Sequence, residues 1–567
     1  MMSRGEGERV QAIVFSIPVF ILAIGAEIAL AAAGGRRSYR LNDAVNSLSL
    51  GILSQISGLF AFALKIGVYV VVFKRLSLFS MPADSGVVWL FALVAYDFCY
   101  YWNHRLGHTC AIFWAAHVVH HQSEDYNLTT ALRQPSTGVL LGWIFYLPLA
   151  VIGVPPLVFA VVALIDLLYQ FWIHTELVGK LGWFDRVFAS PSNHRVHHAV
   201  NKRYRDKNYG GILILWDRLF GTFVEEQEAP IYGVRPSLAS WDPVWANLEI
   251  YWELGRRSMR TRDWRDKVKV WFAAPSWKPA DLADEPTTPF LGRRYDPPAS
   301  LAAQGFAIVT LAACVGSTAW FLWVGEAMAF GVALVVFGAI VAALWAAGAV
   351  LQSRISLWEG LFILVAAFAC SSYALGAQID FWLSKPIATG LAAFAVVARD
   401  APAVPRRLAL AGLVASLVGD ILLANPSLFL FGLAAFLATH LIYIALLTRD
   451  APWLPSRPAV AGAAAFALVL LSILWPGLEG GIKLPVVVYA IAISTMLAQA
   501  IGRAAVLRTG ASLAVACGAA LFAVSDSLIA TTMFAGLDRA WQLAVLPTYW
   551  TAQALISFYV LPRAPQP

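Results

Sequence analysis

Charged residues are scarce in this sequence. Of its 567 residues only 13% are charged and 59% are hydrophobic, and the mean hydropathy is +0.67. A soluble domain has about 25% charged residues and about 45–50% apolar residues. These values exclude a water-soluble fold for the whole chain, so we expect much of its apolar surface to face lipid.

Cysteine is also rare, and the five residues present form no CxxC pair: Cys99, Cys110, Cys314, Cys370 and Cys517. Most of them lie in or beside apolar runs. We therefore expect buried, reduced thiols rather than disulfides or a thiolate metal site.

Basic repeats are absent, although the net charge is +7. Residues 176–300 hold 19 of the 41 Lys and Arg residues and contain no apolar run long enough to span a bilayer. This segment is typical of a cytosolic block lying against the membrane. No nucleic-acid partner is expected.

Long apolar runs make up most of the remaining chain. The first, Ile13 to Ala33, is too long for a signal-peptide core and contains Glu27, so we expect an uncleaved span. Further spans are expected at 50–73, 87–103, 138–152, 155–173, 301–323 and 327–350. Eight more follow at 357–375, 380–399, 405–423, 427–447, 459–476, 484–504, 511–533 and 540–561.

The basic residues between the later spans support this count. Arg354, Arg399, Arg449, Arg503 and Arg563 fall in every second loop, as expected when the positive loops are cytosolic. The sequence thus predicts an all-α, multi-pass membrane protein with three parts. These are residues 1–300 with a metal-binding helical domain, a two-span hairpin at 301–350, and an eight-span bundle at 351–567.

Histidine is concentrated in a short part of the chain. Nine of the ten histidines lie between His104 and His198, in the patterns H-x3-H (His104, His108), H-x2-H-H (His117, His120, His121; His194, His197, His198) and a single His174. Residues i, i+3 and i+4 share one face of a helix, so each group can turn its imidazoles toward one point. We therefore predict all nine as metal ligands.

The number and kind of these residues limit which metal ions the site can hold. A structural zinc site closes with four ligands, often including Cys, whereas nine imidazoles suffice for two ions. Such a site beside a membrane suits iron and O2 chemistry on lipid C–H bonds. A two-zinc hydrolase and a non-catalytic scaffold are the alternatives. Five carboxylates are candidates to orient the imidazoles: Asp97, Glu124, Asp125, Glu176 and Asp206.

The histidine motifs resemble the three histidine boxes of the fatty acid hydroxylase/sterol desaturase superfamily. Further stretches resemble its alkylglycerol monooxygenase group in particular: DFCYYWNH at 97–104, FWAAH at 113–117, SEDYNLTTALRQ at 123–134 and DKNYGGILILWD at 206–217. The resemblance covers about residues 40–300.

This resemblance implies a di-iron centre that uses O2 and two electrons to hydroxylate the carbon next to an ether oxygen. The resulting hemiacetal collapses to a fatty aldehyde and a glycerol product. The animal enzymes are associated with tetrahydrobiopterin, which makes a reduced pterin one candidate donor. The sequence contains no flavin, haem or ferredoxin motif, so the reductant must come from outside the chain. Arg133 and Gln134 are candidates for contact with substrate or cofactor.

Ionisable residues inside the spans of the second half are the other notable feature. Lys385, Asp420 and Asp526 lie at a similar depth in three helices, and His440 lies in a fourth. Charges within a membrane are costly and mark functional sites, although a Lys–Asp pair can also serve only to hold helices together. The sequence therefore predicts a polar pocket inside the bundle.

These positions resemble the YhhN-type lysoplasmalogenase family. The matching pieces are Ser384-Lys-Pro386, SLVGD at 416–420, Gly432 to Tyr443, Gly518 to Asp526, and YWTAQ at 549–553. The resemblance implies hydrolysis of the vinyl ether of lysoplasmalogens with release of a fatty aldehyde. We expect Asp420 and Asp526 to share the acid and base roles, assisted by Lys385 and His440.

Taken together, both halves are expected to release fatty aldehydes from membrane glyceryl ether lipids, with the metal site on the cytosolic side. The histidine boxes do not identify which lipid is the substrate. The alternative is a sterol or fatty acid hydroxylase or desaturase with a non-catalytic C-terminal bundle, and for that bundle a transporter is a further alternative.

Overall fold

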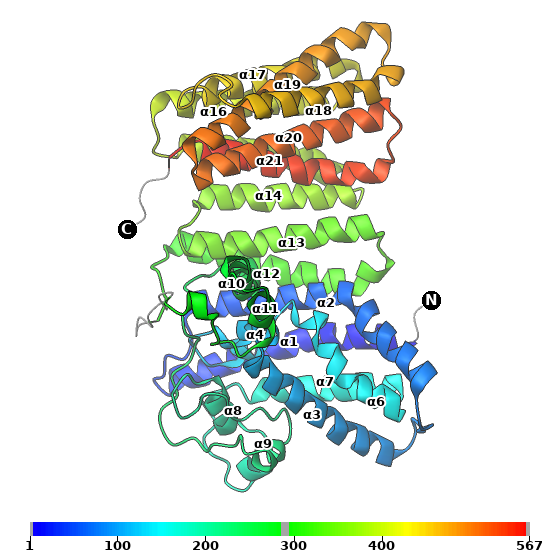
Figure 1. The fold of residues 1–567 in the computed structure, drawn as a ribbon, viewed down its shortest axis with the longest axis vertical. Coiled ribbons are helices and arrows are strands. Elements are labelled where there is room, and N and C mark those ends of the chain that lie inside the picture. The colour runs from blue at the N-terminus through cyan, green and yellow to red at the C-terminus, as the bar shows by residue number, and fades with distance from the viewer. Residues whose placement is uncertain (1–3, 285–293, 563–567) are drawn as a thin grey trace. The chain divides into compact units, whose positions relative to one another are not determined.

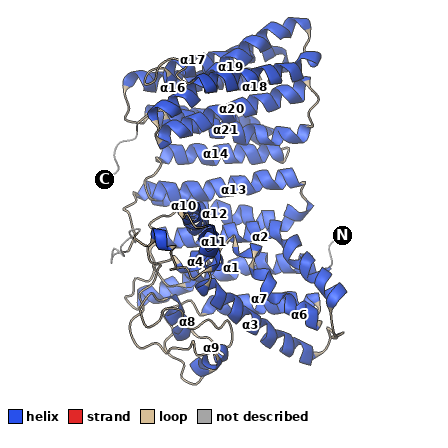
Figure 2. Cartoon of the chain, viewed as in Figure 1, coloured by secondary structure: helices blue, strands red, loops and turns tan. Residues whose placement is uncertain are grey.

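A computed structural model describes residues 4–284 and 294–562. Helices dominate these residues, and the extended backbone pairing among them is a single bridge between Phe188 and Leu213 (Figure 2). The predicted all-α class is confirmed.

Ten helices in the described residues are long and apolar enough to cross a membrane, which confirms a multi-pass membrane protein. The predicted spans at 87–103, 405–423 and 540–561 also form helices, although these are not among the ten. Residues 138–152 differ from the predicted span. They form two 3-10 turns followed by α6, Leu147–Ile152, because Gly142 and Pro148 disfavour a continuous α-helix.

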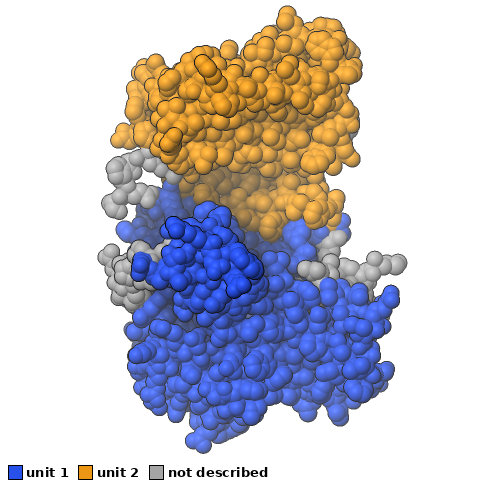
Figure 3. Space-filling view, viewed as in Figure 1, with its two compact units in different colours: residues 1–327, 347–354 blue, residues 328–346, 355–567 orange. Residues whose placement is uncertain are grey.

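The chain packs into two compact units (Figure 3). Unit 1 comprises Met1–Ala327 and Ala347–Arg354, and unit 2 comprises Met328–Ala346 and Ile355–Pro567. The predicted hairpin at 301–350 therefore contributes residues to both units. The three-part domain division stays a prediction.

In the described part of the chain, unit 1 contains the helices α1 to α12, most of which Figure 1 labels. They are α1 (Arg4–Ala33), α2 (Leu41–Leu76), α3 (Gly86–Thr109), α4 (Ala111–His121), α5 (Leu128–Leu132), α6 (Leu147–Ile152), α7 (Pro156–Trp172), α8 (Pro191–His198), α9 (Leu215–Leu219), α10 (Pro243–Arg260), α11 (Trp264–Phe272) and α12 (Leu301–Val324). α13 (Phe330–Leu351) belongs to unit 2 up to Ala346 and to unit 1 from Ala347.

The first turns of α2 are polar but buried, in contrast to the predicted span, which begins nine residues later. Asp43 accepts hydrogen bonds from the hydroxyl of Ser123 and the backbone N–H of Glu124. Asn46 accepts one from Arg133. Because buried polar groups need partners, these bonds fix the segment after α4 against α2.

Unit 2 contains the eight helices predicted for the second half: α14 (Leu357–Ala374), α15 (Gln378–Val397), α16 (Ala403–Leu422), α17 (Phe429–Leu447), α18 (Arg457–Leu474), α19 (Gly480–Leu507), α20 (Gly510–Phe534) and α21 (Val545–Tyr559). Small residues let these helices approach closely. On α16, a Cβ at Gly412 would lie 2.2 Å from the ring of Tyr443, so only glycine fits beside this tyrosine of α17.

Candidate metal centre and a second buried polar site

Four segments of unit 1 carry the nine clustered histidines. The C-terminal part of α3 carries two, α4 carries three, the turn after α7 carries His174, and α8 carries three. α8 begins with Ser190 as N-cap and Pro191 at its first position, and all eight of its residues are buried. A short, polar helix that is wholly buried indicates that its side chains serve a common site.

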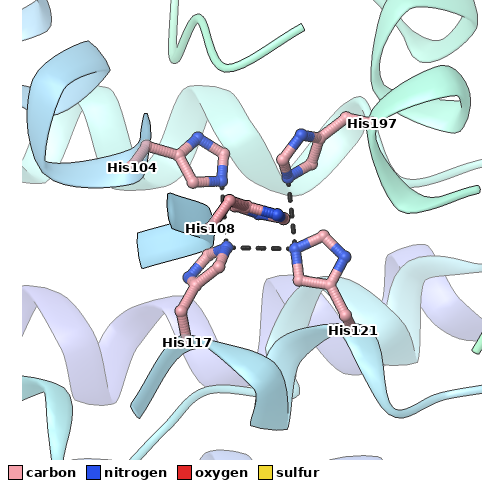
Figure 4. Close-up of side chains that lie close together, drawn as sticks. All are labelled: His104, His108, His117, His121 and His197. Carbon is pink, nitrogen blue, oxygen red and sulfur yellow. Dashed lines mark hydrogen bonds between the residues drawn. The ribbon is translucent and has the colours of Figure 1, made fainter. Parts of the chain in front are cut away.

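The histidines form two groups. In the first group, His104 Nε2 lies 3.0 Å from His117 Nε2, which lies 3.0 Å from His121 Nε2. His197 Nε2 lies 3.2 Å from that of His121, and His108 lies among them (Figure 4). One ligand atom from each of the five residues lies within 4.8 Å of all the others.

The second group has four members. His174 Nε2 lies 3.1 Å from His120 Nε2 and 3.0 Å from His194 Nε2, and His198 Nε2 lies 3.1 Å from that of His194. Two nitrogens bound to one ion about 2.1 Å away at a right angle would be about 3.0 Å apart. The spacing in both groups therefore fits ligands around a metal ion.

The proton positions on the rings strengthen this fit. His120 Nδ1 donates to the carbonyl oxygen of Arg133 at 2.8 Å, and His174 Nδ1 donates to that of Gln170 at 2.7 Å. Because a carbonyl oxygen only accepts, a neutral ring of this kind has its proton on Nδ1 and a bare Nε2. The two bare Nε2 atoms face each other at 3.1 Å. Two lone pairs at this distance repel, and a cation removes the repulsion.

Two further observations agree with a metal site. His108 Nε2 is buried without a hydrogen-bonding partner among the described residues, which leaves it free to bind an ion. Burial lowers the pKa of His120 to about 4, so its ring is neutral at pH 7, the form that ligates metals.

Backbone carbonyls orient the rings of the first group as well. His104 Nδ1 donates to the carbonyl of Tyr209 at 2.8 Å, and His197 Nδ1 donates to that of Lys207 at 3.0 Å. Asp217 accepts from the backbone N–H groups of Tyr209 and Gly210, which fixes this loop. Hydrogen bonds to the outer ring nitrogen set the tautomer and orientation of a ligand histidine.

These carbonyls replace the carboxylates that the sequence suggested for this role. Of the five candidate carboxylates, Asp206 alone comes within 4.0 Å of a histidine nitrogen in the described chain, at 3.9 Å from His108 Nδ1. Asp97 instead accepts from the N–H groups of Ile212 and Leu213. The motif DKNYGGILILWD therefore supplies ring-orienting carbonyls, which no side-chain pattern can reveal.

A cavity of about 520 Å³ adjoins both histidine groups. Its wall includes two histidines of each group: His104, His117, His120 and His174. Most of its remaining lining is apolar, and α1, α2, α7 and α12 contribute much of it. Polar groups are few and contain no Lys or Arg: Ser16, Gln55, Tyr96, Tyr100, Asn103, Gln134, Tyr146, Asp166, Gln170 and Thr318. Such a cavity suits an alkyl chain with a small uncharged head.

The two predicted contact residues lie in different places. Gln134 lines the cavity. The Arg133 side chain is buried away from it, donating to the carbonyl of Val119 at 2.7 Å and to Asn46 at 2.8 Å. Arg133 reaches the metal site through its backbone, which accepts from His120.

The four predicted residues of unit 2 also come together. Lys385 Nζ lies 3.0 Å from Asp420 Oδ1, and His440 Nε2 lies 3.4 Å from Asp526 Oδ2. Lys385, Asp420 and Asp526 line a cavity of about 130 Å³. The predicted polar pocket is therefore present, with apolar walls of residues such as Phe436.

Tyr489 is the site residue that sequence reasoning missed. Its hydroxyl donates to Asp526 Oδ2 at 2.5 Å and lies 2.8 Å from His440 Nε2. The signal was a tyrosine within the apolar stretch LPVVVYAIAI at 484–493 of α19. Tyr549 makes a matching contact on the other side of the cavity, donating to Asp420 Oδ2 at 2.8 Å.

Comparisons with known proteins agree with this division. Residues 89–222 match the model of the fatty acid hydroxylase family, and residues 381–560 match that of the YhhN family. The chain is 42% identical to human alkylglycerol monooxygenase over 245 residues, which cover 43% of the chain and 55% of that protein. For the Danio rerio alkylglycerol monooxygenase the identity is 40% over 276 residues, covering 48% and 61%.

The chain thus spans 55–61% of the length of these two relatives. It is also 31% identical to an ornithine lipid hydroxylase of Rhizobium tropici over 135 residues, 23% of the chain and 40% of that protein. No solved structure matches it. The histidine-rich part of the chain is therefore similar to the fatty acid hydroxylases and, within them, to the alkylglycerol monooxygenases, and its C-terminal part is similar to the YhhN family.

Proposed function

We propose that unit 1 is a membrane monooxygenase that holds two iron ions and cleaves the ether bond of alkylglycerols. The arrangement of nine histidines in two groups, both exposed to one largely apolar cavity, carries this proposal. The similarity to alkylglycerol monooxygenases supports the choice of substrate. In this proposal the first group holds one ion and the second group holds the other.

When bound, the iron ions would activate O2 for insertion of one oxygen atom into the C–H bond next to the ether oxygen. The second oxygen atom leaves as water, which requires two electrons and two protons. The hydroxylated product is a hemiacetal, and its collapse gives a fatty aldehyde and glycerol.

The residues of the chain position the substrate for this reaction. The apolar walls of the cavity would hold the alkyl chain and exclude water. The uncharged polar groups of Asn103, Gln134 and Gln170 would bind the ether and glycerol oxygens near the histidines. The carbonyls of Arg133 and Gln170 keep the bare nitrogens of His120 and His174 directed into the site.

The two electrons come from an external donor in this proposal. A reduced pterin is our candidate, because the related animal enzymes suggest it and the sequence contains no motif for a bound redox cofactor. We also propose that the metal site lies on the cytosolic side, because the loops rich in Lys and Arg alternate along the chain as expected if those loops are cytosolic.

Metal analysis of the purified full-length protein tests the oxygenase proposal. We expect about two irons per chain, and the loss of at least one in His120→Ala. His440→Gln removes the one histidine outside the two groups and serves as the matched control, with unchanged iron content. Aldehyde release from an alkylglycerol under O2 with a reduced pterin then tests the activity. Two zincs per chain in protein grown with ample iron would contradict the oxygenase proposal. Oxidation of sterols or fatty acids, without oxidation of alkylglycerols, would show that the proposed substrate is wrong.

We propose a second activity for unit 2, hydrolysis of the vinyl ether of lysoplasmalogens. The observation that favours it is the pair of carboxylates, Asp420 and Asp526, in one buried cavity. The similarity to the YhhN family supports it. Release of aldehyde from a lysoplasmalogen without O2 tests it, and Asp420→Asn should abolish this release. Both units would then degrade glyceryl ether lipids to fatty aldehydes.

A further inference from the structure

The two carboxylates in the cavity of unit 2 have different surroundings. Asp420 is surrounded by donors: Lys385 lies 3.0 Å from its Oδ1, and Tyr549 and Thr389 donate to its Oδ2 at 2.8 and 3.3 Å. Only 4% of its side chain is exposed. With both oxygens accepting and one partner cationic, Asp420 is held in the arrangement of an ionised carboxylate.

Asp526 has fewer donors. Its Oδ2 accepts from Tyr489 at 2.5 Å, and its Oδ1 has no hydrogen-bonding partner in the described part of the chain. No lysine or arginine forms an ion pair with it there. Since Asp526 lines the cavity, its free oxygen is available to a bound molecule.

The hydrogen-bond directions around Tyr489 show what His440 contributes. Because the Tyr489 hydroxyl donates to Asp526, the short contact of 2.8 Å to His440 Nε2 requires His440 to donate through Nε2–H. His440 Nδ1 is buried and has no hydrogen-bonding partner among the described residues. A proton there would leave a buried donor unsatisfied, so the ring is neutral, with its proton on Nε2. The order of donation is therefore His440 to Tyr489 to Asp526.

We propose that Asp526 is the general acid and Asp420 the general base of the vinyl ether hydrolysis. This assignment rests on the function proposed for unit 2. With Tyr489 donating to Oδ2, the transferable proton of Asp526 lies on Oδ1, toward the cavity. Asp420, kept ionised by Lys385, accepts a proton from water. Lys385, Tyr489 and His440 are positioning residues, since they act through the two carboxylates.

Asp526 gives its proton to the vinyl carbon distant from the ether oxygen, and the double-bond electrons form the new C–H bond. Water attacks the resulting oxocarbenium carbon and loses a proton to Asp420. The hemiacetal then breaks its bond to the glycerol oxygen, which takes up the hydroxyl proton, and a fatty aldehyde leaves. Exchange with water returns a proton to Asp526 and removes one from Asp420, so that no oxidant or reductant is needed.

The other groups around the cavity are consistent with this division. The titratable side chains that face Asp526 come from five helices: Lys385 of α15, Asp420 of α16, His440 of α17, Tyr489 of α19 and Tyr549 of α21. Lys385 is the one cation among these lining residues, and it is paired with Asp420.

Chemical rescue of alanine variants distinguishes the two roles. The full-length protein in detergent is given a lysoplasmalogen, and aldehyde release is measured for Asp526→Ala and Asp420→Ala with added formate over a range of pH. Each variant should lose about 10²- to 10⁴-fold in rate. Added formate should restore the activity of Asp526→Ala in proportion to the concentration of undissociated formic acid. It should restore the activity of Asp420→Ala in proportion to the concentration of the formate anion.

Each outcome has a distinct meaning. The opposite pattern of rescue would overturn the assignment while leaving the hydrolase function in place. Wild-type protein that releases no aldehyde would overturn the hydrolase function and, with it, this assignment. A thermal unfolding transition like that of the wild type shows that both variants fold, and Ser472→Ala, an exposed change on α18, is the control for handling.

Lys385→Met gives a second, independent measurement. Lys385 Nζ lies 3.0 Å from Asp420 Oδ1, so without this cation the base is held less well and aldehyde release should fall. Lys385→Arg, which keeps a cation beside Asp420, should retain more of the activity than Lys385→Met does. Equal rates for the wild type and Lys385→Met would show that Lys385 does not position the base.

Discussion

The bare Nε2 atoms of His120 and His174 face each other at 3.1 Å because both rings donate their only proton to backbone carbonyls. Such an arrangement is unfavourable in a protein without a cation. Under the proposed function, binding of metal should therefore stabilise this part of unit 1.

Removal of the metal should destabilise unit 1. A ligand that binds only the folded state adds stability that grows with its concentration relative to its dissociation constant. Dialysis against a chelator should therefore lower the thermal unfolding temperature, and added Fe²⁺ should restore it under anaerobic conditions. His120→Ala, which lacks one of the facing nitrogens, should gain less from added iron than the wild type does. An unfolding temperature that does not change on treatment with chelator would contradict the presence of a metal centre.

Acid should have a similar effect in the metal-free protein. Burial lowers the pKa of His120 in the folded state to about 4, below its ordinary value of 6.5. Between these values the unfolded chain binds a proton that the folded chain does not, so stability falls as the pH is lowered from about 6.5 to about 4. Unfolding of the chelated protein monitored across this range tests the sign. His120→Gln, which lacks this titrating ring, should show a smaller dependence of stability on pH.

Gly210→Ala should disturb the metal site without touching a histidine. A Cβ at this position would lie 2.5 Å from the carbonyl oxygen of Leu213, so the backbone must shift. The neighbouring Tyr209 carbonyl orients His104, and we expect lower iron occupancy. Gly179→Ala is the matched control, because a Cβ there meets nothing within 4 Å. Equal iron content in both variants would show that this carbonyl is dispensable.

Substitutions at the adjacent residues Gln134 and Arg133 should have different effects on activity and iron content. Gln134→Leu removes a polar group from the cavity wall, so we expect about a tenfold lower kcat/KM for an alkylglycerol with iron content retained. Arg133→Met leaves the carbonyl of Val119 and Asn46 without their buried donor, so we expect loss of stability and iron. Iron analysis beside kinetics separates the two effects. Arg133→Met with full iron and only a raised KM would instead support direct substrate contact.

The ion pair of unit 2 offers a test of stability. Lys385→Met leaves the Asp420 carboxylate buried without its cation, which typically costs about 3–5 kcal/mol. The double variant Lys385→Met/Asp420→Leu removes both charges and should recover most of this loss. Unfolding of the three proteins in detergent checks the order. A double variant less stable than Lys385→Met would show that the pair contributes net stability.

The sequence by itself determined the membrane character and the helical class, and it singled out the nine histidines as candidate metal ligands. Each of these depends on residue type and local spacing: apolar runs long enough for a bilayer, and imidazoles at i, i+3 and i+4 of a helix. The same holds for Lys385, Asp420 and Asp526, since a charge within an apolar span is conspicuous without any coordinates.

Only the tertiary structure decided how these residues are grouped. His120 and His121 are neighbours in α4 but belong to different groups, because successive residues on a helix point about 100° apart and meet different partners. The partners of His121 come from α3, which directly precedes α4, and from α8, 76 residues away at His197. Those of His120 come from α8 and from the turn after α7, 54 residues away at His174. The carbonyls of Tyr209 and Lys207 orient two rings through the path of the backbone, which side-chain identity does not encode. Long-range packing also joins Tyr489 to Asp526, and it thereby distinguishes two carboxylates that look alike in the sequence.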